Sequence, residues 1–159
     1  MTLRDVAQGI ADYLADDEVL HDGGNVTVVV EDKAVAAFEI AQAIAQTGVC
    51  VLVAVTDFRR VQNSPLLQGT LSLQITCYEN PELNRGDLST LTAQGAMERI
   101  VEILHYARFP FLANQVLFSD FSRDDVREAN VLRGNFTVNT VLGYGGAGAA
   151  ENENNEQGG

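Results

Sequence analysis

Few residues in this sequence have the types and spacing that catalysis or metal binding requires. His21 and His105 are far apart, and neither has a second histidine four residues away, the spacing that places two imidazoles on one face of a helix. Cys50 and Cys77 lie inside apolar runs and are too few for a disulfide framework or a zinc site. We therefore expect two structural histidines, two reduced core thiols and no metal.

Glycine-rich and acidic segments are the remaining candidates for chemistry. The segment GYGGAGA at 143–149 follows the last expected strand, opens no helix and lacks the lysine of a phosphate-binding loop, so we interpret it as a linker. The acidic run at 16–18 lacks the glycine-spaced pattern of an EF-hand and is expected to be a solvated helix end. Asp124 and Asp125 lie beside two arginines, which is typical of a mixed-charge hairpin tip. We expect no catalytic residue and no cofactor.

A different signal comes from a strand whose polar residues carry no charge. In LSLQITCY at 71–78, apolar residues alternate with polar ones, as in a strand with one apolar and one polar face. The polar residues are Thr70, Ser72, Gln74 and Thr76, and a similar uncharged set follows at Asn135, Thr137 and Asn139. Uncharged polar groups avoid the desolvation cost of buried ions and still form hydrogen bonds. The pattern therefore fits a face against another subunit, the lining of a channel, or open water.

Arg59 and Arg60 interrupt an acidic chain in the connection that follows an expected central strand. The planar guanidinium of arginine binds carboxylates in two places, which makes arginine common at interfaces. The two residues fit either ordinary surface charges or a contact to an acidic surface on a neighbouring subunit. Our candidate subunit interface therefore contains Arg59, Arg60, Thr70, Ser72, Gln74 and Thr76.

The overall composition is that of an acidic chain long enough to bury its own core. The 159 residues carry 22 acidic and 10 basic side chains, for a formal net charge of −12. Such a chain is a poor non-specific binder of nucleic acid, because phosphate contacts need clustered cations. The N-terminal residues carry charges where a signal peptide has its apolar segment, and no apolar run approaches the roughly 18 residues of a membrane span. We expect a protein of the reducing cytosol without a membrane partner.

Hydrophobic periodicity predicts three helices and five strands. The helices are expected over 3–15, 33–46 and 90–107, and the strands over 26–30, 49–58, 68–79, 114–121 and 129–142. This order, α-β-α-β-β-α-β-β, predicts an α+β fold in which helices pack on a mostly antiparallel sheet. Residues 1–142 form a single domain in this interpretation. Residues 143–159 form a Gly/Asn/Glu-rich tail with too little apolar surface to fold alone.

The order and character of these elements resemble the tail-terminator and tail-completion proteins of long-tailed phages. The resemblance is carried by the strand GTLSLQITCYENPEL with the amphipathic helix LTAQGAMERIVEIL after it, by the leading helix with its DYLADDEVL turn, and by the closing strands that end in FTVNTVLGY. It covers about residues 3–142 and is a pattern of elements, not a signature motif. The complete strand and helix of VTVVVEDKAVAAFEIAQAIAQTG and the C-terminal tail depart from the family pattern.

The resemblance implies a non-enzymatic virion protein that forms a ring of six copies on the end of the tail tube. Its partners are then copies of itself, the tail tube protein and the connector or neck proteins of the head. Assembly takes place in the host cytoplasm, and DNA passes through the ring without specific binding. An acidic chain suits this role, since a basic lumen would retain the genome.

Two alternatives to a tail cap stay open on the sequence. A head-side connector completion protein belongs to the same class of virion parts. A small-ligand binding α+β domain, or an enzyme, belongs to a different class and predicts a concave pocket with converging polar groups and a shifted pKa.

Overall fold

The computed structural model describes residues 2–22, 25–31, 42, 48–80, 91–126 and 129–142. The elements are α1 (Leu3–Ala15), α2 (Glu18–Asp22), β1 (Val26–Val30), β2 (Val49–Arg60), β3 (Gln68–Glu79), α4 (Ala93–Leu104), β4 (Leu117–Val126) and β5 (Ala129–Val141). The predicted α+β class is confirmed, and the short helix α2 is an addition to the predicted order. Apart from residue 42, the helix predicted over 33–46 lies outside the described residues, and so does the tail at 143–159.

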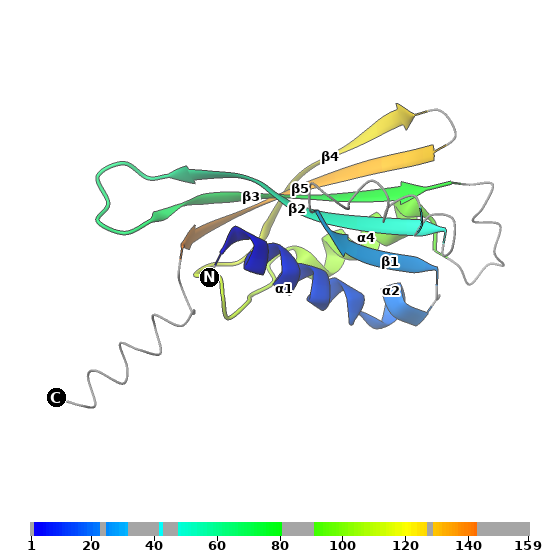
Figure 1. Ribbon diagram of the computed structural model, residues 1–159, viewed down its shortest axis with the longest axis horizontal. Coiled ribbons are helices and arrows are strands. Elements are labelled where there is room, and N and C mark those ends of the chain that lie inside the picture. The colour runs from blue at the N-terminus through cyan, green and yellow to red at the C-terminus, as the bar shows by residue number, and fades with distance from the viewer. Residues whose placement is uncertain are drawn as a thin grey trace.

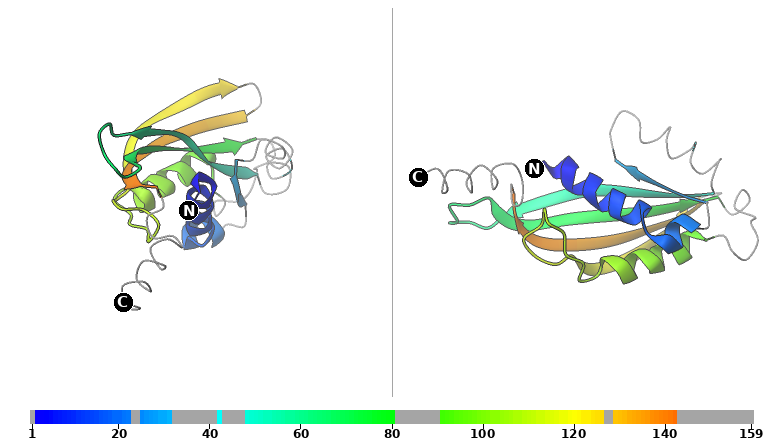
Figure 2. Two further views of the ribbon diagram at one scale, coloured as in Figure 1. Left: turned by 60° about the vertical axis from the view of Figure 1, so that its left-hand side comes forward. Right: turned by 90° about the horizontal axis from the view of Figure 1, so that it is seen from below.

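Five strands form one mixed sheet in the order β1-β2-β3-β5-β4. β1 pairs in parallel with β2, and the other neighbouring strands are antiparallel. The predicted antiparallel pairing of β2 and β3 is confirmed, with Val53 opposite Ile75. The helices α1, α2 and α4 lie together on one face of the sheet (Figures 1 and 2). Strands β1 and β4 are the edges of the described sheet.

The hydrophobic core lies between the helices and one face of the central strands. On β3 the alternate residues Leu71, Leu73, Ile75 and Cys77 are at most 1% exposed. The helices contribute Val6, Ile10 and Leu14 from α1 and Met97, Ile100 and Leu104 from α4. Helix α4 packs so closely over β5 that a Cβ added at Gly134 would lie 2.8 Å from the sulfur of Met97. Among the described residues, no helix has the length and apolar character needed to cross a membrane.

Threonine residues cap the N-termini of α1 and α4. Thr2 forms a capping box with Asp5, in which each side chain accepts a hydrogen bond from the other residue's backbone N–H. The later helix begins after the predicted start at residue 90, because Thr92 is the N-cap of α4 and accepts from the N–H of Gly95 at 3.0 Å. Each cap satisfies an amide that the first helical turn leaves unpaired.

The acidic run at 16–18 has a structural partner that the sequence did not indicate. Asp17 is the centre of this arrangement, because both of its carboxylate oxygens accept hydrogen bonds from Arg99 of α4, at 2.8 and 3.0 Å. The Asp17 side chain is 11% exposed, so the expectation of a solvated helix end is wrong at this residue. The pair joins α4 to the corner between α1 and α2.

A β-bulge at Thr56 changes which face of β2 its residues occupy. Before the bulge, the odd-numbered residues of β2 face the helices. After it, Asp57 and Arg59 pair with residues on the opposite face of β3, and Phe58 takes the place beside Leu71 on the helix side. The bulge therefore gives the end of β2 one apolar and one charged face.

Beyond the bulge, β2, β3 and their connecting loop project from the body of the molecule (Figure 1). We call residues 56–68 the arm. Gly69 pairs with Arg60 where the strands enter the loop, and an added Cβ there would clash with the carbonyl oxygen of Arg59. The two strands approach so closely at this point only because Gly69 has no side chain.

Strand β4 extends further than the sequence predicted. The predicted strand ended at 121 and placed Asp124 and Asp125 at the hairpin tip. Both residues instead lie in β4, opposite Val131 and Asn130 of β5, and Asp124 forms an ion pair with Arg133. The prediction failed because charged residues in an exposed edge strand look like a turn in the sequence.

Candidate subunit interface

The four predicted polar residues of β3 lie in register with polar residues of β5. The opposed pairs are Thr70 with Asn139, Ser72 with Thr137, Gln74 with Asn135, and Thr76 with Arg133. These eight residues alternate with the core residues and lie on the side of the sheet away from the helices. We call them the polar face. The structure thus joins the two sets of uncharged residues that the sequence indicated separately.

Hydrogen bonds between side chains run across this polar face. The hydroxyl of Thr70 donates to Oδ1 of Asn139 at 2.8 Å, and Nε2 of Gln74 donates to Oδ1 of Asn135 at 3.3 Å. Nδ2 of Asn135 in turn donates to Oδ1 of Asp120 on β4, at 2.5 Å. These bonds restrict the side-chain rotamers of three strands, so less conformational entropy would be lost when another surface covers them.

The polar face is not uniformly accessible. Thr76 is only 3% exposed, whereas the other three polar residues of β3 are half-buried. Next to it on the same side of the strand, Tyr78 is half-buried, and burial raises the pKa of its hydroxyl. The interface role of Thr76 stays a prediction, and its burial in a single chain gives it no surface to present.

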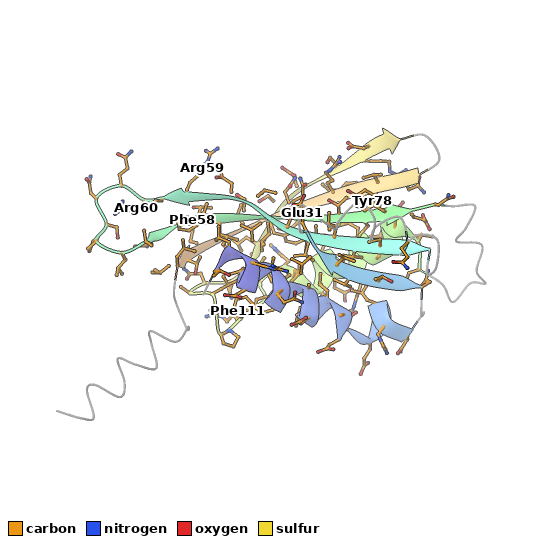
Figure 3. The ribbon with its side chains drawn as sticks, in the orientation of Figure 1. Glu31, Phe58, Arg59, Arg60, Tyr78 and Phe111 are labelled. Carbon is orange, nitrogen blue, oxygen red and sulfur yellow. The ribbon has the colours of Figure 1, made fainter. Side chains whose placement is uncertain are left out.

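Arg59 and Arg60 both lie on the arm and point in different directions (Figure 3). The Arg59 side chain is 86% exposed and shares the row of Thr70 and Asn139, with its Nε 2.9 Å from a carboxylate oxygen of Asp57. Arg60 donates to the carbonyl oxygen of Ser64 at 2.8 Å and so folds over the loop. The structure therefore adds Arg59 to the row of polar side chains and places Arg60 at the tip.

Sequence reasoning missed a groove between α4 and the edge strand β4. Its volume is about 500 Å³, and Met97, Val101, Phe118 and Phe121 form its apolar lining. Phe121 is 47% exposed, which is unusual for a phenylalanine in a strand. Phe118 and Phe121 are three residues apart and would lie on opposite faces of a regular strand, so only the irregularity between Phe118 and Asp120 places both beside α4.

The rim of the groove is polar, and its groups bond to one another. Arg123 donates to Oε1 of Gln94 at 3.2 Å, and Nε2 of Gln94 donates to Oε1 of Glu98 at 3.2 Å. These groups lie along the rim and do not converge on a point inside the groove. The groove is therefore an apolar surface with a hydrogen-bonded polar border.

The histidine, aspartate and cysteine side chains that could react lie outside the groove, where they take part in the packing and hydrogen bonding of the fold. His105 accepts a hydrogen bond at Nδ1 from a backbone N–H of β4, at 3.0 Å. Bonds from Arg99 lower the pKa of Asp17, and burial raises the pKa of the Cys77 thiol. In the part of the chain that the structure describes, no three His, Cys, Asp or Glu residues form a group that could hold a metal ion. A non-enzymatic role stays a prediction.

No protein-family model matches the sequence, and no curated protein matches it. Among solved structures, this chain is similar to a chain from the virion of a native gene transfer agent particle, with a TM-score of 0.57 and 14% sequence identity. The match covers 83% of this chain and 91% of that chain. At this identity, the likeness shows a shared fold.

Proposed function

We propose that this chain is a structural protein of a phage-like virion, and that it forms a ring that caps the tail tube and joins the tail to the head. The observation that carries the proposal is the fold shared with a chain of a gene transfer agent virion over 83% of the length. The resemblance of the element pattern to phage tail terminators points to the tail cap in particular. The number of six copies comes from that resemblance.

The surface of the chain supports a role in assembly. Ring closure needs two different patches on each copy, because each copy contacts one neighbour on each side. The arm and the groove between α4 and β4 are two such patches, and each exposes large apolar side chains, among them Leu66 at 56% and Phe121 at 47%. Exposed apolar patches of this kind are typical of interaction sites.

The charge of the chain supports a role around moving DNA. With a net charge of −12, a ring of several copies repels the phosphate backbone and does not retain a passing genome. The proposed partners are copies of the chain, the tail tube protein and the head-side connector or neck proteins. The protein acts in the host cytoplasm during assembly, catalyses no reaction and stays in the virion.

A second candidate function is the binding of a small apolar ligand. It is favoured by the groove volume of about 500 Å³, which lies within the range of known ligand sites, roughly 300–1,000 Å³. The lack of convergent polar groups in the groove argues against it, because ligand sites use such groups to fix orientation.

Electron microscopy of growing tail tubes tests the proposal. Purified tube protein is allowed to polymerise with and without this chain, and tube lengths and end shapes are compared; a parallel sample mixes the chain with head connectors. A cap predicts shorter tubes with a ring of density on one end. Tubes of unchanged length with bare ends would contradict the proposed function, and rings seen only on head connectors would favour the head-side alternative.

A further inference from the structure

We infer that the tip of the arm docks into the groove between α4 and β4 of a neighbouring copy. This inference rests on the proposed function, because it names the contact that closes the ring. The occupant of the groove is then a second copy of this chain.

The tip of the arm presents apolar side chains that the chain itself does not cover. Val61, Leu66 and Leu67 are 51%, 56% and 53% exposed. Residues with this much apolar surface at the end of a projecting hairpin are stabilised by transfer out of water, at about 25 cal/mol for each Å² covered. The tip therefore has the composition of an anchor.

The tip is held in one shape before any partner arrives. The backbone N–H of Val61 donates to the carbonyl oxygen of Gln68 at 2.8 Å, and that of Leu66 donates to the Ser64 hydroxyl at 3.3 Å. The N–H of Leu142 donates to the carbonyl oxygen of Leu67 at 3.0 Å and ties the loop to β5. A preorganised tip loses less conformational entropy on binding than a free loop does.

The groove offers the matching apolar surface. Its lining comes from Met97, Val101, Phe118 and Phe121, and methionine and phenylalanine side chains pack well against branched aliphatic ones. The groove lies along α4 and β4, whereas the tip of the arm points away from both elements (Figures 1 and 2). The two patches do not overlap, so every copy can use both at once, as a closed ring requires.

Charged groups lie beside both patches: Arg123 and Glu98 line the groove, and Arg59 on the arm pairs with Asp57. The arm contributes Arg59 and Arg60 to an otherwise acidic chain. The exposed side of α4 beside the groove contributes Glu98 and Glu102, which are one helical turn apart. Glu102 pairs with Arg99 at 3.4 Å and Glu98 accepts a hydrogen bond from Gln94, and each exposed carboxylate keeps acceptor capacity for a cation from a neighbouring arm. The apolar contact and the charged contact therefore favour the same pairing.

Complementation between two defective chains tests the docking. The tip-defective chain carries Leu66→Asp with Leu67→Asp and keeps its groove, and the groove-defective chain carries Phe121→Asp and keeps its tip. All three positions are exposed, so both chains should fold, which their ¹⁵N spectra check directly. Neither variant can bind further copies of itself, but the intact tip of one fits the intact groove of the other. A mixture is thus expected to stop at a 1:1 dimer.

Chemical-shift titration measures this pairing even when it is weak. The ¹⁵N-labelled tip-defective chain is titrated with the unlabelled groove-defective chain, and saturable shifts are expected at Met97, Val101 and Phe118. A chain with both defects is the negative control and should bind at least about 30-fold more weakly, as removal of an interface anchor does. A groove-defective chain with Val19→Asp, an exposed apolar residue on α2, is the neutral control and should bind normally.

The outcomes separate this inference from the proposed function. Absence of shifts at the groove at millimolar concentration, or equal shifts with the doubly defective chain, overturns the docking. If wild-type protein still stops tube growth in that case, the cap function stands and the copies meet elsewhere. If the defective chains pair but wild-type protein leaves tubes uncapped, the docking stands and the function fails. If the arm binds the tube and not a neighbouring copy, the tip-defective chain still forms rings. That outcome also overturns the docking.

Discussion

The two faces of the sheet are built on the same strands but carry opposite kinds of side chain. On β3, Leu73 and Ile75 are at most 1% exposed and pack beneath the helices, whereas their neighbour Gln74 points the other way and bonds to Asn135. A buried aliphatic side chain contributes about 1.5–3 kcal/mol to folding, and a hydrogen bond about 0.5–1.5 kcal/mol. Residues one position apart therefore differ in kind: one side of the strand carries buried apolar side chains, and the other carries partly exposed hydrogen-bonding groups.

The largest expected effect comes from a charge on the helix side of β3. Ile75→Asp should unfold the chain, because an unpaired carboxylate at a fully buried position costs several kcal/mol against a typical total stability of about 5–15 kcal/mol. Circular dichroism during thermal or urea unfolding measures the loss.

The matched control is Gln74→Asp, one residue away on the polar face. Because Gln74 is half-buried and a carboxylate there can stay hydrated, the chain should fold with a modest loss of stability. A normally folded Ile75→Asp protein, or unfolding by both changes, would mean that the two faces do not differ as described.

The two faces also differ in their ion pairs. On the helix side, Arg99 binds Asp17 through two hydrogen bonds, and the side chains are 26% and 11% exposed. On the polar face, the side chains of Arg133 and Asp124 are 32% and 43% exposed. Exposed pairs contribute little because water screens them. Arg99→Leu should therefore lower the midpoint of thermal unfolding at pH 7 by several degrees, and Arg133→Leu by less.

The pH dependence of the Arg99 effect gives a sharper test. The bonds from Arg99 hold the pKa of Asp17 below the ordinary aspartate value of about 3.9. The resulting stability is fully present above that ordinary value and is lost as the pH falls through the lowered, folded-state value. The gap in unfolding free energy between wild type and Arg99→Leu should stay constant from pH 7 to about 5 and narrow below 4. A gap that widens in acid would contradict the assignment.

A smaller effect on stability is expected from the centre of the polar face. Asn135→Ala removes the acceptor of Gln74 and the donor to Asp120, which should cost about 0.5–1.5 kcal/mol in unfolding free energy. If the face contacts another subunit, the change should also weaken ring formation, measured by light scattering or by ring counts on tubes.

Asn114→Ala is the control for this change. The side chain of Asn114 donates one comparable bond, to the carbonyl oxygen of Asn139 at 2.7 Å, but it lies outside the polar face. Equal effects of the two changes on assembly would indicate that the polar face is an ordinary wet surface.

Much of this two-faced sheet could be predicted from the sequence, because side chains alternate with a period of two. The alternation along β3 and β5 identified both the core residues and the polar residues. Thr76 escaped the prediction, since it looks like Ser72 in the sequence and is nevertheless 3% exposed. The burial of a single polar residue depends on what the rest of the chain places over it, which the strand's own pattern does not contain.

The candidate site was less predictable, because it depends on register and on elements far apart in the chain. The bulge at Thr56 brings Arg59 into the row of Thr70. The apolar run before the bulge contains no residue pattern that predicts this change of register. The groove requires α4 and β4 to lie side by side. The second half of β4 was not predicted, because its charged residues were interpreted as a hairpin tip. Local pattern thus identified the residues of the arm but not the surface that would receive them.

The smallest effect on stability, and a distinct effect on assembly, is expected from the arginines of the arm. The double change Arg59→Glu with Arg60→Glu should leave the unfolding free energy within about 0.5 kcal/mol of wild type, because both residues are exposed. Ring formation should weaken about tenfold, since the arm would then meet Glu98 and Glu102 of its neighbour with like charge. Reversal of those two residues to arginine in the same chain should restore assembly, and the wild-type contact should weaken as salt screens it. Loss of assembly without rescue would show that the arginines contact something other than α4, and unchanged assembly would show that they are ordinary surface charges.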